Sequence, residues 1–125
     1  MKKIIATEHA PKAVATYSQA IEVNGTLYIS GQIAIDPLSG KMIDGDVKAQ
    51  TERVLKNIEA VLIAAGYTYK DVVKTTCLLS NINDYQAMNE VYGKIFFEEA
   101  PARAAFAVSG LPLGALVEIE TIAVK

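Results

Sequence analysis

A chain of 125 residues with a net charge of −2 and an isoelectric point of about 5.4 is long enough for one domain with a buried core. The acidic balance offers no basic surface to phosphates, which argues against nucleic acid as a partner. Cys77 is the only cysteine and His9 the only histidine, so an internal disulfide and a zinc site of these residues are excluded.

No apolar run approaches the roughly 20 residues of a membrane-spanning helix. The N-terminus becomes polar too early to contain the apolar core of a signal peptide, so we expect a cytoplasmic location and no membrane partner. The chain shows no linker, repeat or low-complexity segment. We therefore expect one domain over residues 1–125.

The first half of the chain predicts a β-hairpin over residues 20–23 and 26–34. Asn24-Gly25 between these strands suits a type I′ turn, which needs positive φ at both positions. Ser30-Gly31 interrupts the apolar pattern of the second strand, which indicates a bulge or a close approach to the backbone. A turn over residues 36–40 and a surface loop follow.

The middle of the chain predicts helix, strand and helix in turn. Apolar residues at three- and four-residue steps predict an amphipathic helix over residues 47–65, closed by Gly66. A β-branched run over residues 72–80 predicts a strand, and the polar segment 81–84 caps a second helix. Right-handed crossovers place both helices on one face of the sheet.

Residues 101–124 predict two apolar strands joined by a turn at Leu111-Pro112-Leu113-Gly114. The fold class is therefore α+β, with one sheet face left uncovered. Apolar residues occur at both parities of the strands, and an exposed apolar sheet face usually marks an interface. We expect an obligate homo-oligomer.

Arg103 stands among small apolar residues in this last stretch, and an unpaired guanidinium is costly to bury. Its partner is either an internal carboxylate, Glu118 or Glu120, or the carboxylate of a ligand held by two hydrogen bonds. Spacing alone favours the internal salt bridge. Arginine, carboxylates and hydroxyls are suited to binding a small anion and a water molecule, and this chemistry requires no metal or cofactor.

Several motifs, in order over nearly the whole chain, resemble the RidA/YjgF family of reactive-intermediate (enamine/imine) deaminases, also labelled endoribonuclease L-PSP. They are I-A-T-E-H-A-P at 5–11, Y-S-Q-A at 17–20, I-S-G-Q-I at 29–33, V-K-T-T at 73–76, P-A-R at 101–103 and L-P-L-G-A-L-V-E-I-E-T-I-A at 111–123. The resemblance implies a chorismate-mutase-like sheet with two helices on one face. It also implies a homotrimer whose sheets face a central barrel, with ligand sites between subunits.

The resemblance also implies catalytic roles for two residues. Arg103 would clamp the carboxylate of 2-iminobutanoate or 2-iminopropanoate. Glu118, the first glutamate of V-E-I-E, would orient or activate the attacking water and pass a proton to the departing ammonia. The product would be a 2-keto acid.

Five further positions are implied to bind substrate. Tyr17 and Ser30 would line the pocket, Gly31 would let the substrate approach the backbone, and Asn89 would lie nearby. Ala105 stands where many relatives have cysteine, so only a backbone role remains there. From the residues alone, Tyr17, Ser30, Gly31 and Asn89 also have purely structural readings as a packed tyrosine, a strand serine, a bulge glycine and a helix-surface asparagine.

Two other functions remain open. Some relatives are labelled RNA-cleaving translation inhibitors, although the acidic charge and the lack of a second histidine argue against this activity. A non-enzymatic role, as a small-carboxylate sensor or a chaperone-like trimer, is the other.

Overall fold

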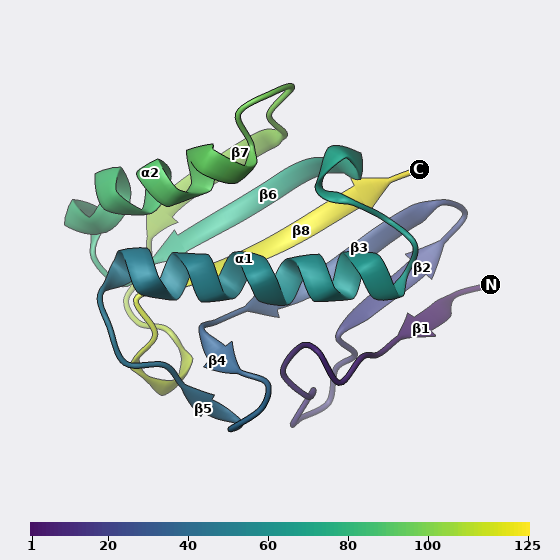
Figure 1. Cartoon of the computed structure of the whole chain (residues 1–125), viewed down its shortest axis with the longest axis horizontal. Helices are drawn as coiled ribbons and strands as arrows, with labels where there is room; N and C mark the ends of the chain where they lie inside the picture. Colours follow the sequence, from purple (N-terminus) through teal and green to yellow (C-terminus); the bar gives the residue numbers. More distant parts are fainter.

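A computed structural model describes all 125 residues and places two helices on one face of a six-stranded sheet (Figure 1). The strand order is β1-β2-β3-β8-β6-β7, with β7 parallel to β6 and all other neighbours antiparallel. The strands are β1 (Lys3–Ile5), β2 (Ala20–Val23), β3 (Thr26–Gln32), β6 (Val72–Leu79), β7 (Ala102–Ala107) and β8 (Val117–Val124). A separate two-stranded ribbon pairs β4 (Ile35–Asp36) with β5 (Lys41–Met42).

The longer helix, α1 (Val47–Ala64), begins and ends where the sequence provides caps. The carboxylate of Asp46 accepts the backbone N–H of Ala49 at 3.0 Å. Gly66 follows the C-cap with φ +83°, a conformation that glycine adopts at little cost. The predicted helix over 47–65 is thereby confirmed.

The shorter helix, α2 (Tyr85–Ile95), follows the single-turn helix η2 (Ile82–Asp84). The side chain of Asn81 caps η2 by accepting the N–H of Asn83 at 2.9 Å. The remaining short helices are η1 (Tyr69–Asp71) and η3 (Pro112–Gly114). Both α-helices pack on the same face of the sheet, as predicted (Figure 1).

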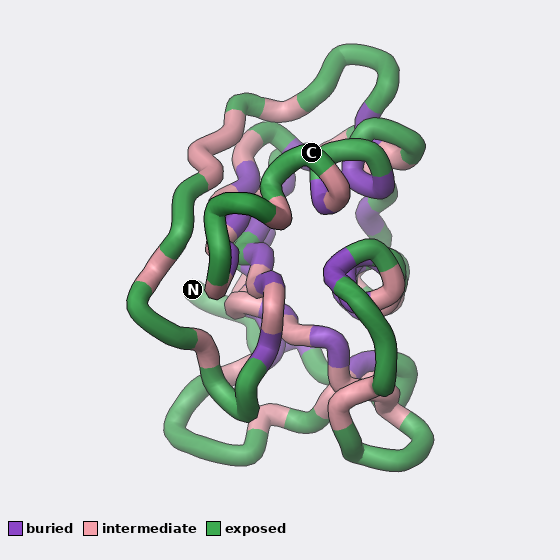
Figure 2. Tube along the Cα trace, turned by 90° about the vertical axis from the view of Figure 1, so that its left-hand side faces the viewer, coloured by how far each residue is buried: buried purple, intermediate pink, exposed green.

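The core lies between the helices and this face of the sheet (Figure 2). Alternate residues of the strands are buried there, because side chains of a strand point to opposite faces. The central strand β8 has this alternating pattern, and its residues Val117, Ile119 and Ala123 are fully buried. Fully burying a valine or isoleucine side chain, such as that of Val117 or Ile119, stabilises the fold by about 1.5–3 kcal/mol.

The opposite face of the sheet carries apolar side chains that nothing in the chain covers. One row of strand partners across it runs through Ile4, Ile21, Tyr28 and Ile122. Tyr28 is 50% exposed, and Phe106 on β7 is 47% exposed. We call this the open face.

The pairing of the last two strands differs from the prediction. Both strands exist, but β7 and β8 do not pair with each other, because β6 lies between them. The α2 crossover places β7 parallel to β6 at the edge, whereas the antiparallel return of β8 fills the centre beside β3. The hairpin and its bulge are confirmed, since the β3–β8 register shifts between Ile29 and Gln32. The short strand β5 replaces part of the predicted surface loop, and β1 is a strand that was not predicted from the sequence.

Candidate active site

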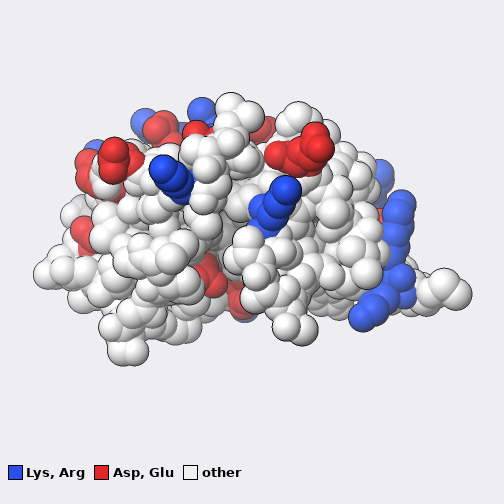
Figure 3. All heavy atoms as spheres, turned by 90° about the horizontal axis from the view of Figure 1, so that it is seen from below, with Lys and Arg blue, Asp and Glu red and all other residues white.

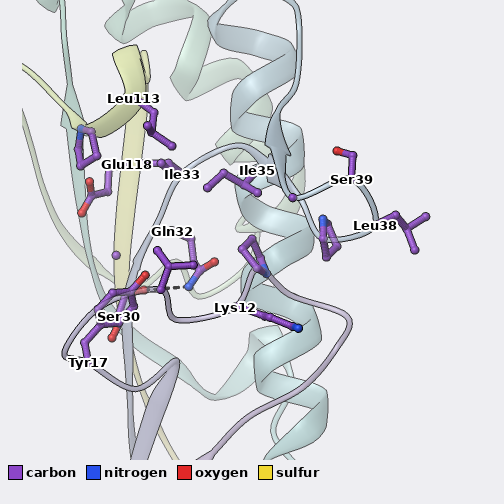
Figure 4. A pocket seen from close by; sticks show the side chains of 16 residues that line it. Lys12, Tyr17, Ser30, Gln32, Ile33, Ile35, Leu38, Ser39, Leu113 and Glu118 are labelled. Atoms are coloured by element: carbon purple, nitrogen blue, oxygen red, sulfur yellow. Dashed lines mark hydrogen bonds between the residues drawn. The ribbon is translucent and has the colours of Figure 1, made fainter.

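A cavity of about 750 Å³ lies beside the Ser30-Gly31 bulge. Its lining includes four of the sequence-predicted site residues: Tyr17, Ser30, Gly31 and Glu118. In Figure 4, Glu118, Ser30 and Tyr17 lie toward one end, and Lys12, Leu38 and Ser39 toward the other. The structure therefore brings together predicted residues that come from a loop, β3 and β8.

Hydrogen bonds of Ser30 and of the buried Gln19 side chain hold the loop that carries Tyr17. The hydroxyl of Ser30 donates to the carbonyl of Ser18 at 2.6 Å. The side chain of Gln19 is buried and bonds the loop before it, accepting from Thr7 N–H at 2.7 Å and donating to the carbonyls of Thr7, Ala10 and Pro11. Ser30 therefore positions this loop in addition to lining the cavity, and Gln19 is a supporting residue that the sequence reasoning did not single out.

The space above Gly31 is occupied by the side chain of Glu118. A Cβ at position 31 would clash with Oε2 of Glu118 and would lie 2.9 Å from its Cδ. Glycine here thus makes room for the carboxylate, whereas the sequence reasoning assigned that room to the substrate. Burial, and then the nearby charge of Glu120, raise the pKa of Glu118 above its ordinary value.

Arg103 lies in a second cluster, between β7 and α2. Its Nη1 donates to Oδ1 of Asn89 at 2.7 Å, and its Nη2 donates to the hydroxyl of Tyr85 at 2.7 Å. The guanidinium carbon stands 4.7 Å from the centre of the Tyr92 ring. Asn89 was predicted, but the two tyrosines were missed, although positions 85, 89 and 92 share one face of a helix.

The internal salt bridge that spacing favoured for Arg103 is wrong. The ion pair in the structure is the surface pair Lys48–Glu90, at 2.7 Å. Arg103 is the strand partner of Thr75 and lies on the helix side, whereas Glu118 and Glu120 are partners of Leu78 and Thr76 on the open face. Side chains on opposite faces of a sheet cannot pair.

The predicted site is therefore divided within one chain. Tyr17, Ser30, Gly31 and Glu118 line the cavity, whereas Arg103 and Asn89 lie beyond β6 on the other side of the sheet. Ala105 shares the helix side with Arg103, pairs with Cys77 and packs partly buried against the core.

Other titratable groups offer little for catalysis. Burial raises the pKa of the Cys77 thiol to about 11, so it stays protonated near neutral pH. His9 lies apart from both clusters, in a shallow depression with Lys56 and Glu59. No three His, Cys, Asp or Glu side chains gather as metal ligands, and no helix has the length and apolar character needed to cross a membrane. The face seen from below in Figure 1 shows no broad basic area (Figure 3).

The protein is thus of the α+β class, with a mixed sheet covered on one face by two helices, an arginine held by neutral groups and a cavity that contains a glutamate. Residues 7–125 match the family model described as endoribonuclease L-PSP. The chain belongs to this family, which is the RidA/YjgF family that its motifs resemble.

Named relatives match the chain over all or nearly all of its length. The 2-iminobutanoate/2-iminopropanoate deaminase of Mus musculus is 47% identical over 100% of this chain and 93% of its own. A Rid family protein of Yersinia pestis, of unknown function, has a TM-score of 0.96 at 49% identity, covering 100% of both chains. TdcF of E. coli, solved with bound serine, has a TM-score of 0.94 at 36% identity, covering 98% of both chains.

Proposed function

We propose that this protein is a cofactor-independent hydrolase that converts 2-iminobutanoate and 2-iminopropanoate to 2-keto acids and ammonia in the cytoplasm. The observation that carries the proposal is the guanidinium of Arg103, which two neutral acceptors orient and no carboxylate of the chain neutralises. Such a group is suited to a small carboxylate ligand. The full-length mammalian deaminase relative supports this choice of substrate.

The chemistry needs few groups, because a protonated imine is already a strong electrophile. Arg103 binds the substrate carboxylate, and Glu118 accepts a proton from a water molecule whose oxygen bonds to the imine carbon. The same proton passes to the nitrogen of the resulting carbinolamine. The C–N bond then breaks with its electron pair on nitrogen, and ammonia leaves. The carbonyl forms as the hydroxyl gives its proton to Glu118, which passes it to ammonia, so the products are the 2-keto acid and ammonium. Acid–base help of this kind contributes about 10²–10⁴ in rate.

Both groups act on one substrate only if they come from two copies of the chain, since they lie on opposite sides of one sheet. We propose a homotrimer whose open faces meet around a central barrel, with each substrate between Arg103 of one copy and Glu118 of the next. The exposed apolar residues of the open face, such as Tyr28 and Phe106, support this burial. Tyr17 and Ser30 would line the same site.

Subunit mixing tests this proposal. Arg103→Ala and Glu118→Gln are each expected to be inactive as pure proteins. When equal amounts are unfolded together and refolded, random assembly gives about a quarter of the sites both intact residues, and therefore about a quarter of parental activity. Activity is measured as the loss of enzymatically generated imine trapped by semicarbazide. No regain of activity in mixed trimers would contradict a site shared between copies, and an active Arg103→Ala protein would remove the mechanism.

A further inference from the structure

The Arg103 guanidinium is held by the predicted Asn89 and by two tyrosines of α2, Tyr85 and Tyr92, that no motif of the sequence suggested. We infer that Tyr85 is a positioning residue that presets Arg103 for the substrate carboxylate, an inference that rests on the proposed function. Its hydroxyl accepts the N–H of Nη2 at 2.7 Å, and its ring centre lies 5.5 Å from the guanidinium carbon.

Tyr85 and Asn89 together fix the plane of the guanidinium. They lie four residues apart on one face of α2, and each accepts from a different terminal nitrogen of Arg103. The Tyr92 ring is fixed in turn, since its hydroxyl shares a hydrogen bond of 2.7 Å with Oγ1 of Thr75. Loss of the Tyr85 hydroxyl would leave one terminal nitrogen without an acceptor, so a long side chain regains rotational freedom that binding must remove.

The two groups that accept hydrogen bonds from Arg103, Asn89 and Tyr85, are neutral, and this leaves the charge of Arg103 available to a ligand. A carboxylate at either position would fix the arginine equally well but would also cancel its charge. With a hydroxyl and an amide, the full positive charge stays available. Each terminal nitrogen keeps a second N–H, and Nε keeps its own, and none of these donates within the chain. A planar carboxylate can still bind by two parallel hydrogen bonds.

The test removes one hydroxyl and compares it with a matched hydroxyl elsewhere. Tyr85→Phe keeps the ring and deletes the acceptor. Tyr67→Phe is the control, because it also loses a tyrosine hydroxyl bonded at 2.7 Å, but to Glu22 on the distant strand β2. The readouts are KM and kcat for 2-iminobutanoate and the Kd of 2-oxobutanoate by titration calorimetry.

Tyr85→Phe is expected to raise KM and this Kd by about 2- to 10-fold, the ordering cost of one long side chain, while kcat changes less than about twofold. Tyr67→Phe should change neither constant. The same binding experiment with neutral 2-oxobutanamide should show no difference between Tyr85→Phe and the parent, because the effect acts through a carboxylate.

Two results would overturn the inference, and they separate it from the proposed function. If Arg103→Ala abolishes 2-oxobutanoate binding and Tyr85→Phe matches the parent, the clamp stands and Tyr85 has no role in it. If Arg103→Ala itself binds and turns over as the parent does, the proposed function fails, and the positioning role fails with it. Tyr85 is 38% exposed, so loss of its hydroxyl should leave the fold intact.

Discussion

Replacing Asn89 by aspartate would place a carboxylate of nearly the same shape against Arg103. Oδ1 of Asn89 accepts from Nη1 at 2.7 Å, so the new charge would stand about 4 Å from the guanidinium centre. At that distance a charge pair is worth about 4 kcal/mol near a protein surface and about 1 kcal/mol in water. The new charge and the substrate carboxylate would share one guanidinium and repel each other. Arg103 is partly buried, so we take about 1.5–3 kcal/mol for this repulsion, which corresponds to about 10- to 150-fold weaker binding of the substrate carboxylate.

The assay is the Kd of 2-oxobutanoate for Asn89→Asp, with KM measured alongside. Asn24→Asp is the charge-matched control, because the turn between β2 and β3 tolerates aspartate at positive φ. Thermal stability should stay equal or rise slightly in Asn89→Asp, since a new ion pair adds at most about 1 kcal/mol. Binding and stability would then change in opposite directions. Parental affinity in Asn89→Asp, or an equal loss in Asn24→Asp, would refute the reasoning.

Three further substitutions test the other parts of the structure. Gly31→Ala should lower kcat by about 10²-fold with little change in 2-oxobutanoate binding, because the new methyl group would take the place of the Glu118 carboxylate and displace it. Thr121→Val should raise the free energy of unfolding by about 1 kcal/mol in urea titrations, because the buried Oγ1 of Thr121 has no hydrogen-bond partner. Glu120→Gln should shift the acidic limb of the kcat/KM profile to lower pH, because the Glu120 charge raises the pKa of Glu118, which must lose its proton to act as a base.

Matched controls make these outcomes specific. Gly93→Ala adds a methyl group that meets no atom within 4 Å and should leave kcat unchanged. Thr51→Val also removes a buried hydroxyl, but one that donates to the carbonyl of Val47 at 2.7 Å, so it should not stabilise the fold. An acidic limb that stays in place in Glu120→Gln would mean that another group controls the profile.

Local patterns were sufficient to predict most elements of this fold. The Asn24-Gly25 hairpin, the bulge at Ser30-Gly31 and both α-helices depend on neighbours in sequence, and all were found where expected. The position of β8 between β6 and β3 depends on pairing between distant segments, which periodicity does not encode. The sequence therefore supplied the residues of the candidate site but could not tell which face of the sheet each would occupy.

The same limit explains the error over Arg103. Strands that follow each other in the chain suggested that Arg103 and Glu118 face one another, and a salt bridge seemed the simplest partner. Because β6 lies between their strands, the register of each strand against β6 decides whether Arg103 and Glu118 lie on the same face of the sheet. The observed register places them on opposite faces. The sequence gives only a weak indication of the role of Tyr85. Spacing shows which residues share a helix face, but it does not show which group that face contacts.

The charges of Arg103 and Glu118 together determine which ligand would suit the proposed site. Arg103 keeps an uncancelled positive charge, and Glu118 is a carboxylate whose ionised form is disfavoured by burial and by Glu120. In the proposed assembly, two copies would bring these groups together. A protonated 2-imino acid carries a negative carboxylate and a positive iminium group a few bonds apart, so it would relieve both charges there. The 2-keto acid product has lost the positive group, so it no longer stabilises ionised Glu118. The proposed arrangement would therefore favour the substrate over its product, and the electrostatics that bind the imine would also promote release of the keto acid.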